Sequence, residues 1–294
     1  MDRPHRPVLA AEVVGLFAGK SLVMDATVGS GGHAEALLEA GVEAVVGVDR
    51  DPDALEETSA RLARFGTRFH PVRARFSQLE EVADRTKVTL VGGILYDLGV
   101  SSMQLDRPER GFSYRGAGPL DMRMGQVEER SPSAADVVNR YSEEDLARVI
   151  FEYGEERFAR RIARAIVRAR SRRPISTTDE LAAIVAGAVP RRRGGPHPAR
   201  RTFQALRIEI NRELEELAAS LPQAAGLLEP SGRLVAISYH SLEDRIVKRF
   251  LLGDPRLAVL TRKPVRASEE ERRANPRARS ARLRAADRLE QEAA

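Results

Sequence analysis

Three aspartates in the first hundred residues each close a short apolar run, and a glycine-rich stretch follows the first of them. The acids are Asp25, Asp49 and Asp97. Ligands bind at the carboxyl edge of an open parallel sheet, where successive strand ends meet, so these carboxylates are expected to lie together. One such Asp would ordinarily be a helix cap or a turn former. Three in succession favour a binding site.

The glycine-rich stretch Gly29-Ser30-Gly31-Gly32-His33-Ala34 fits the pattern G-x-G-x-x-A between a strand and a helix. Glycines let the backbone approach a ligand closely, and the N-terminus of the helix beyond them offers free N–H groups. Asp49 comes 18 residues after Gly31, where a carboxylate can accept hydrogen bonds from both hydroxyls of a ribose. The loop therefore predicts a nucleoside-containing cofactor, either a nicotinamide dinucleotide or S-adenosylmethionine.

Two of the acids favour S-adenosylmethionine over a nicotinamide-dependent oxidoreductase. Asp25 lies beside the loop, where it would attract a cationic methionyl group and repel a pyrophosphate. Asp97 adds a second acid at the same edge of the sheet. Phe76 follows the third predicted strand and is a candidate to cover an adenine ring, with a plain core role as the alternative.

The elements that would position these residues alternate between strand and helix patterns over the first hundred residues, which predicts a parallel sheet covered by helices. The expected strands are 22–24, 44–48, 69–74 and 91–96, with helices at 34–38 and 52–65. A helical run follows at 134–139, 143–151, 155–170 and 178–188. The remaining elements are helices at 201–220 and 243–252 and strands at 234–238, 257–260 and 281–285. The pattern indicates an α/β sheet with an inserted all-helical domain, divided as 1–107, 108–200 and 201–294.

The composition narrows the function classes. The 294 residues contain no Cys, which excludes a disulfide scaffold, a Cys-ligated metal site and a cysteine nucleophile, and which is typical of a reducing cytoplasm. We expect no membrane span or secretory signal, because no apolar run approaches about 18 residues. Of the 48 basic residues, 44 are Arg, and they crowd at 157–173, 191–201 and 272–284. Such clusters predict an anionic partner, with nucleic acid foremost, although a solvated helix face explains any single one.

Nine motifs follow one another in order and nearly from end to end of the chain. They are DATVGSGGH (25–33), VDRDP (48–52), DLGVSSMQL (97–105), RGFS (110–113), GPLDMRM (118–124), YGEERFA (153–159), RTFQALRI (201–208), SYHSLED (238–244) and NPRARS (275–280). In these motifs the chain resembles the bacterial small-subunit ribosomal RNA cytosine-N4 methyltransferases of the MraW/RsmH family. The match is far more specific than the glycine loop alone.

The resemblance implies a class I methyltransferase (Rossmann-like) sheet, a helical insertion and S-adenosylmethionine as donor. The expected target is the N4 of a cytosine in the decoding region of 16S rRNA, within the small ribosomal subunit. The family's cofactor contacts correspond to Gly31, Gly32, His33, Asp49, Phe76, Asp97 and Gln104. We also expect no metal and a cytoplasmic location, and a homodimer stays open.

Methylation of an exocyclic amine needs no thiol adduct, unlike methylation of C5 of a pyrimidine. It needs the amine to be positioned and its developing positive charge to be stabilised. Asp97 is the first candidate for this catalytic role and Asp121 the second. Tyr239 and His240 end the fifth strand, and His240 is either a proton relay or a structural histidine.

The sequence departs from the wider class of amino-group methyltransferases at one place. The usual Asp/Asn-Pro-Pro-aromatic stretch is Asp97-Leu98-Gly99-Val100 here, so no residue is assigned to stack on the cytosine. The competing hypothesis is a non-catalytic RNA-binding ribosome assembly factor that retains the fold. The intact glycine loop, Asp49 and Asp97 argue against it, because a decayed site should have lost some of them.

Overall fold

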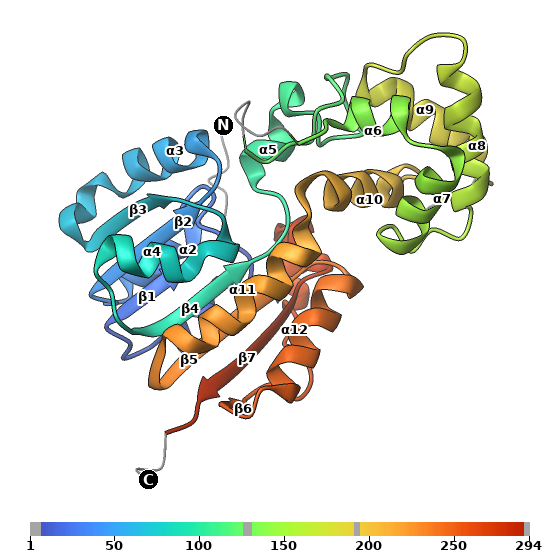
Figure 1. Ribbon diagram of the computed structural model, residues 1–294. Coiled ribbons are helices and arrows are strands. Elements are labelled where there is room, and N and C mark those ends of the chain that lie inside the picture. The colour runs from blue at the N-terminus through green and yellow to red at the C-terminus, as the bar shows by residue number, and fades with distance from the viewer. Residues whose placement is uncertain (1–6, 126–130, 191–194, 291–294) are drawn as a thin grey trace. The chain divides into compact units, whose positions relative to one another are not determined.

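The computed structural model describes residues 7–125, 131–190 and 195–290, and the chain divides into two compact units (Figure 1). The first unit comprises residues 1–99 and 214–294, and the second comprises residues 100–213. The second unit is therefore an insertion between the fourth and fifth strands, as the sequence predicts. No helix of the described ranges is long and apolar enough to cross a membrane.

A seven-stranded sheet forms the centre of the first unit. Its strands are β1 (Leu22–Asp25), β2 (Ala44–Asp49), β3 (Phe69–Arg73), β4 (Val91–Asp97), β5 (Leu228–Ser238), β6 (Leu257–Val259) and β7 (Arg282–Arg288). The spatial order is β3-β2-β1-β4-β5-β7-β6. The first five strands are parallel, and β7 runs antiparallel to both of its neighbours. This is a class I methyltransferase sheet, and the predicted fold class is confirmed.

Helices bury both faces of this sheet, which explains why its central strands are apolar at nearly every position. The helices of the first unit are α1 (Ala10–Leu16), α2 (Gly32–Glu39), α3 (Pro52–Leu62), α4 (Leu79–Thr86), α11 (Glu213–Leu227), α12 (Ser241–Gly253) and α13 (Glu269–Ala274). Successive strand residues face opposite ways, so Val23 and Met24 of β1 enter different core clusters. The cluster around Met24 includes Leu79 of α4 and Leu221 of α11. The cluster around Val23 includes Leu37 of α2.

The regular secondary structure described in the second unit is helical, apart from one isolated bridge between Pro119 and Thr177. The helices are α5 (Ser102–Asp106), α6 (Ala134–Arg140), α7 (Glu143–Glu152), α8 (Ala159–Arg170), α9 (Thr178–Ala188) and α10 (Arg200–Asn211). Side-chain caps at Ser133 and Ser142 fix the first turns of α6 and α7. One apolar core joins these helices, so the unit has the interior that an independent domain needs.

The structure places the limits of the insertion differently from the sequence. The predicted limits, 108 and 200, both fall inside the second unit. Val100 and Leu105 already pack against the helical core, and Phe203 and Leu206 of α10 belong to it. Packing of apolar side chains, rather than the Pro- and Gly-rich composition used to place the limits, decides where the unit begins and ends.

Two predicted helices also have different ends. The single helix expected over 201–220 is two helices, because Arg212 adopts a left-handed conformation (φ 51°) between α10 and α11. The helix expected from 155 begins at Ala159, because Glu155 is also left-handed (φ 47°) and a turn precedes the helix. The break at Arg212 involves neither Gly nor Pro, so no local sequence signal marks it, whereas the turn at Glu155 directly follows Gly154.

Candidate active site

The loop between β1 and α2 needs its glycines. Gly29 and Gly31 have positive φ angles of 51° and 78°, which side chains rarely allow. A Cβ atom on Gly31 would lie 2.8 Å from Cγ2 of Thr58, and the hydroxyl of Thr58 donates a hydrogen bond to the carbonyl of Gly29. The next residue, Gly32, begins α2. Backbone N–H groups at a helix start can therefore approach a ligand closely here.

Asp49, at the end of β2, ties that strand to the glycine loop. Its Oδ2 accepts a hydrogen bond from the N–H of Gly29 (3.0 Å), and its Oδ1 accepts one from the N–H of Asp51 (2.9 Å). Burial raises the pKa of Asp49 to about 6, although these two hydrogen bonds oppose the rise. The side chain is half-buried, and each carboxylate oxygen keeps further lone pairs. The carboxylate can still accept the two ribose hydrogen bonds that the sequence predicts for it.

Three elements converge on Asp97, which ends β4 and whose side chain is 27% exposed. Tyr239, directly after β5, donates its hydroxyl to Oδ1 at 2.6 Å. The Nε2 of His33, on α2, lies 3.4 Å from Oδ2. Thr27 holds the main chain in place, because its Oγ1 accepts a hydrogen bond from the N–H of Asp97 (2.7 Å). The Asp97 carboxylate is therefore anchored on one side and still reachable by solvent.

Asp25 lies almost completely buried behind this group. Its Oδ1 accepts a hydrogen bond from the N–H of Thr27 (3.1 Å). Burial raises the pKa of Asp25 to about 7; the charge of His33 opposes this rise, and the charges of Asp97 and Asp49 add to it. The three strand-end acids are therefore close enough for their charges to repel one another, as their positions in the sequence predict.

His33 is held in this acidic surrounding without ideal partners. Burial lowers its pKa, but the negative charges of Asp97 and Asp25 prevail, so its pKa is raised above the ordinary value. Within the described ranges, neither ring nitrogen makes a well-aligned hydrogen bond. A buried imidazole of this kind points to a ligand that would complete its hydrogen bonds.

Phe76 lies in a short 3₁₀ turn after β3 and is half-buried. Its ring meets Tyr96 edge-on, with centroids 6.2 Å apart. Its carbonyl accepts a hydrogen bond from Ser220, whose Oγ also lies 2.6 Å from the Tyr96 hydroxyl. Part of the ring therefore serves the core, and the exposed part leaves the adenine-covering role as a prediction.

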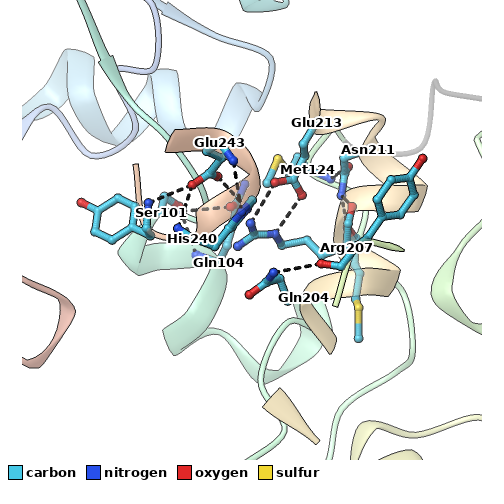
Figure 2. A network of polar contacts seen from close by, with 12 residues as sticks. Ser101, Gln104, Met124, Gln204, Arg207, Asn211, Glu213, His240 and Glu243 are labelled. Atoms are coloured by element: carbon cyan, nitrogen blue, oxygen red, sulfur yellow. Dashed lines mark hydrogen bonds and ion pairs between the residues drawn. The ribbon is translucent and has the colours of Figure 1, made fainter. Parts of the chain in front are cut away.

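Gln104 and Asp121 belong to the second unit. Gln104 forms a capping box with Ser101 at the start of α5: its Oε1 accepts from the Ser101 N–H at 3.1 Å, and its own N–H donates to the Ser101 hydroxyl at 3.2 Å (Figure 2). Asp121 grips the guanidinium of Arg123 with both oxygens (2.9 and 2.7 Å). Burial raises the pKa of Asp121, but the hydrogen bonds and charge of Arg123 outweigh it and lower the pKa overall. These contacts give both residues a structural role, and their cofactor and catalytic roles stay predictions.

The remaining polar contacts around the ends of α10 and β5 also hold the backbone (Figure 2). His240 caps α12: its Nδ1 accepts from the N–H of Glu243 (3.4 Å), and the Oε2 of Glu243 accepts from the N–H of Tyr239 (2.8 Å). In the second unit, Arg207 forms a two-point ion pair with Glu213 (2.8 and 2.9 Å). These contacts favour the structural alternative for His240.

Sequence reasoning missed two residues of the site, Thr27 and the anchoring role of Tyr239. Thr27 lies inside the first motif, so a polar side chain two residues beyond Asp25 was an available signal. The bond between Tyr239 and Asp97 spans 142 residues, and only the pairing of β4 with β5 brings the two together.

The chain is similar over nearly its whole length to curated proteins named ribosomal RNA small subunit methyltransferase H. The protein of Deinococcus deserti is 54% identical over 288 residues, covering 97% of this chain and 93% of its own. That of Carboxydothermus hydrogenoformans is 47% identical over 311 residues, covering 98% and 99%. A solved rRNA methylase from Streptococcus thermophilus aligns with 98% of this chain and 100% of its own, with a TM-score of 0.45 and 13% identity.

The donor-binding features and the family match agree. The glycine loop, the half-buried Asp49 and the incompletely bonded His33 suit a nucleoside with a cationic group. The sequence signature of the MraW methylase family matches residues 2–289. The chain belongs to the MraW methylase family.

Proposed function

We propose that this protein methylates the exocyclic N4 of a cytosine in the decoding region of 16S rRNA, within the small ribosomal subunit. The relatives' shared name, ribosomal RNA small subunit methyltransferase H, supports the RNA and the subunit. The anchored, partly exposed carboxylate of Asp97 is the single observation that carries the amine target.

Apart from Gln104, the residues that would hold the cofactor belong to the first unit. The backbone at Gly31 and Gly32 would receive its polar groups, and Asp49 would accept hydrogen bonds from the ribose. When bound, S-adenosylmethionine supplies a methyl group on a positively charged sulfur. The partly exposed carboxylate of Asp97 is the group that would attract this cation, whereas the raised pKa values of Asp25 and His33 favour their protonated forms.

Asp97 has the properties that methylation of an amine requires. The lone pair of cytosine N4 is delocalised into the ring, so the amine must be oriented and its growing positive charge stabilised. One oxygen of Asp97 is fixed by the Tyr239 hydroxyl at 2.6 Å, and the carboxylate remains partly open. We assign Asp97 to accept a hydrogen bond from N4 and to be the first acceptor of the proton that N4 loses. Tyr239 is then a positioning residue.

The absence of cysteine supports N4 over C5 of the pyrimidine. Methylation at C5 depends on a covalent thiol adduct that makes this carbon nucleophilic. The chain has no Cys and so lacks the nucleophile for that route. Methylation of N4 needs only placement and charge stabilisation, which the edge of the sheet provides.

The test uses the whole chain, radiolabelled S-adenosylmethionine and small subunits purified from cells that lack this protein. The RNA is digested to nucleosides, which are separated and identified by mass. We expect label in N4-methylcytidine and its loss in Asp97→Asn. Label in 5-methylcytidine or in a purine would refute the N4 assignment. Tight cofactor binding without any transfer would instead support the assembly-factor hypothesis.

A further inference from the structure

The three arginine clusters of the sequence differ in how far the structure buries or pairs their side chains. Residues 191–193 of the second cluster lie outside the described residues. The C-terminal cluster is largely engaged within the first unit. Arg284 is buried and pairs with Asp244 (2.7 Å), and Arg282 approaches the same carboxylate at 3.4 Å. The cluster on α8 is different, because most of its arginines point to solvent.

Helix α8 has two opposite faces. Its buried residues, Ile162, Ala163 and Ile166 among them, pack into the helical core. With about 100° between successive residues, the opposite face carries arginines at helical spacing. All of these arginines are exposed, and we call them the arginine stripe: Arg160, Arg161, Arg164, Arg168 and, in the turn that follows, Arg172.

The stripe is poorly compensated by acids. Arg164 approaches Glu143 at 3.4 Å, a pair whose two side chains are both well exposed and therefore weak. The other four members have no ion-pair partner within the ranges 7–125, 131–190 and 195–290. By contrast, Arg170 turns inward to the carbonyls of residues 138 and 141, and Arg173 pairs with Glu180 at 2.6 Å. The arginines with a structural role are therefore those outside the stripe.

Such an arrangement weakens the helix that carries it. Like charges three or four residues apart on a helix repel one another, and Arg160, Arg164 and Arg168 form two such pairs. The Cβ atoms of successive stripe residues on the helix are about 5–6 Å apart. Each guanidinium group can donate two N–H groups to one phosphate. A flexible polyanion with regularly spaced phosphates is the ligand that such a row of charges fits.

We propose that the arginine stripe of α8 binds the phosphate backbone of the RNA substrate. This inference rests on the proposed function for the identity of the RNA, but it concerns binding rather than methyl transfer. It predicts that the stripe contributes affinity and salt dependence without sequence specificity, because phosphate contacts position an RNA and do not read its bases.

The experiment compares two triple variants of the full chain that lose the same charge. The stripe variant is Arg161→Gln, Arg164→Gln and Arg168→Gln. The matched control is Arg140→Gln, Arg148→Gln and Arg173→Gln, three exposed arginines of the same unit that pair with carboxylates. Binding of a fluorescent fragment of the 16S rRNA decoding region is measured by anisotropy across a salt series.

Each lost phosphate contact should lower the salt slope by about 0.7 for a single strand, so the stripe variant should lose about two units. At about 0.15 M salt this corresponds to a ten- to hundredfold weaker affinity. The control should keep both slope and affinity near wild type. Equal losses in the two variants would show a mere effect of net charge, and an unchanged stripe variant would make α8 a solvated face. Either result would overturn the proposal.

Further measurements distinguish RNA binding by the stripe from effects on the cofactor site or on stability, from the proposed function and from binding to a membrane. Both variants should bind S-adenosylmethionine like wild type, and the stripe variant should unfold at the same or a higher temperature because it loses repulsion. A wild-type protein that binds RNA through the stripe but transfers no methyl group would refute the proposed function and leave the stripe standing. Stripe-dependent binding to vesicles of an acidic phospholipid, with RNA binding unaffected, would assign the surface to a membrane instead and overturn the proposal.

Discussion

Removing a single oxygen atom tests the proposed role of Asp97. Tyr239→Phe keeps the ring, which packs against the core, and deletes only the hydroxyl that donates to Asp97 Oδ1 at 2.6 Å. The hydrogen bond from the Asp97 N–H to Thr27 fixes the main chain and leaves the carboxylate free to rotate. His33 is 3.4 Å from the other oxygen. The Tyr239 hydroxyl is therefore the main anchor of this carboxylate in the described part of the chain.

The size of the expected loss follows from the type of bond. A hydrogen bond to a charged group contributes about 1.5–3 kcal/mol, and each 1.4 kcal/mol is a factor of ten in rate. If the carboxylate must be oriented in the transition state, Tyr239→Phe should slow methyl transfer by roughly ten- to a hundredfold. Because the bond orients Asp97 rather than binding the donor, the loss should fall on kcat and leave the affinity for S-adenosylmethionine within about threefold.

Single-turnover methyl transfer at saturating donor and RNA measures this effect directly. Tyr141→Phe is the matched control, since its hydroxyl also donates to a carboxylate, Glu209, at 2.9 Å in the second unit. Combining Tyr239→Phe with Asp97→Asn should add no loss beyond that of Asp97→Asn, because the two residues act as one group. A Tyr239→Phe rate within twofold of wild type, or full additivity in the double variant, would refute the reasoning.

Three further outcomes are expected. Asp49→Ala should weaken S-adenosylmethionine binding about ten- to a hundredfold in calorimetric titration, and unchanged affinity would contradict the ribose assignment. Gly31→Ala should destabilise the protein by about 1–3 kcal/mol in urea unfolding, because φ is +78° and Thr58 lies in the way, whereas Gly187→Ala on α9, with open space around it, should be neutral or stabilising. The pKa of Asp25 is about 7 in the folded protein against 3.8 for a free side chain, so the native state holds its proton more tightly. Its contribution to stability is therefore fully present below about pH 4 and lost as pH rises to about 7; Asp25→Asn should flatten the decline in unfolding free energy between pH 4 and 7, and an equal decline in the variant would count against the shift.

The parts of this molecule that the sequence predicts are those written in short contiguous patterns. Asp25, Asp49 and Asp97 each end an apolar run, and the glycine loop carries its own conformational requirement, so their meeting at one sheet edge follows from general rules of parallel sheets. The insertion between β4 and β5 follows from the interruption of the alternating pattern, whereas the strand order is seen only in the structure. Local signals suffice here because each one constrains a single turn or strand.

The parts that the sequence does not predict depend on contacts between distant residues. Tyr239 reaches Asp97 only because β5 lies beside β4. Arg212 breaks a helical pattern without Gly or Pro, at the place where one compact unit gives way to the other. From the sequence, all three arginine clusters give the same prediction of an anionic partner. In the structure, however, Arg284 is buried in an ion pair and Arg168 is exposed. Burial and partner choice are tertiary properties, and they decide whether a charge is structural or available.

The position of the insertion explains how one chain can combine these two kinds of site. Only Leu98 and Gly99 separate Asp97 from the first residue of the helical unit. The apolar clusters of the first unit and the core of the second are each complete within their own unit, so the insertion leaves the sheet and its acids intact. The helix α8 that carries the arginine stripe and the strand end that carries the proposed proton acceptor therefore belong to different units of one chain. Affinity and chemistry can then change independently: substitutions in the stripe act on RNA binding, and substitutions at Asp97 or Tyr239 act on the rate of transfer.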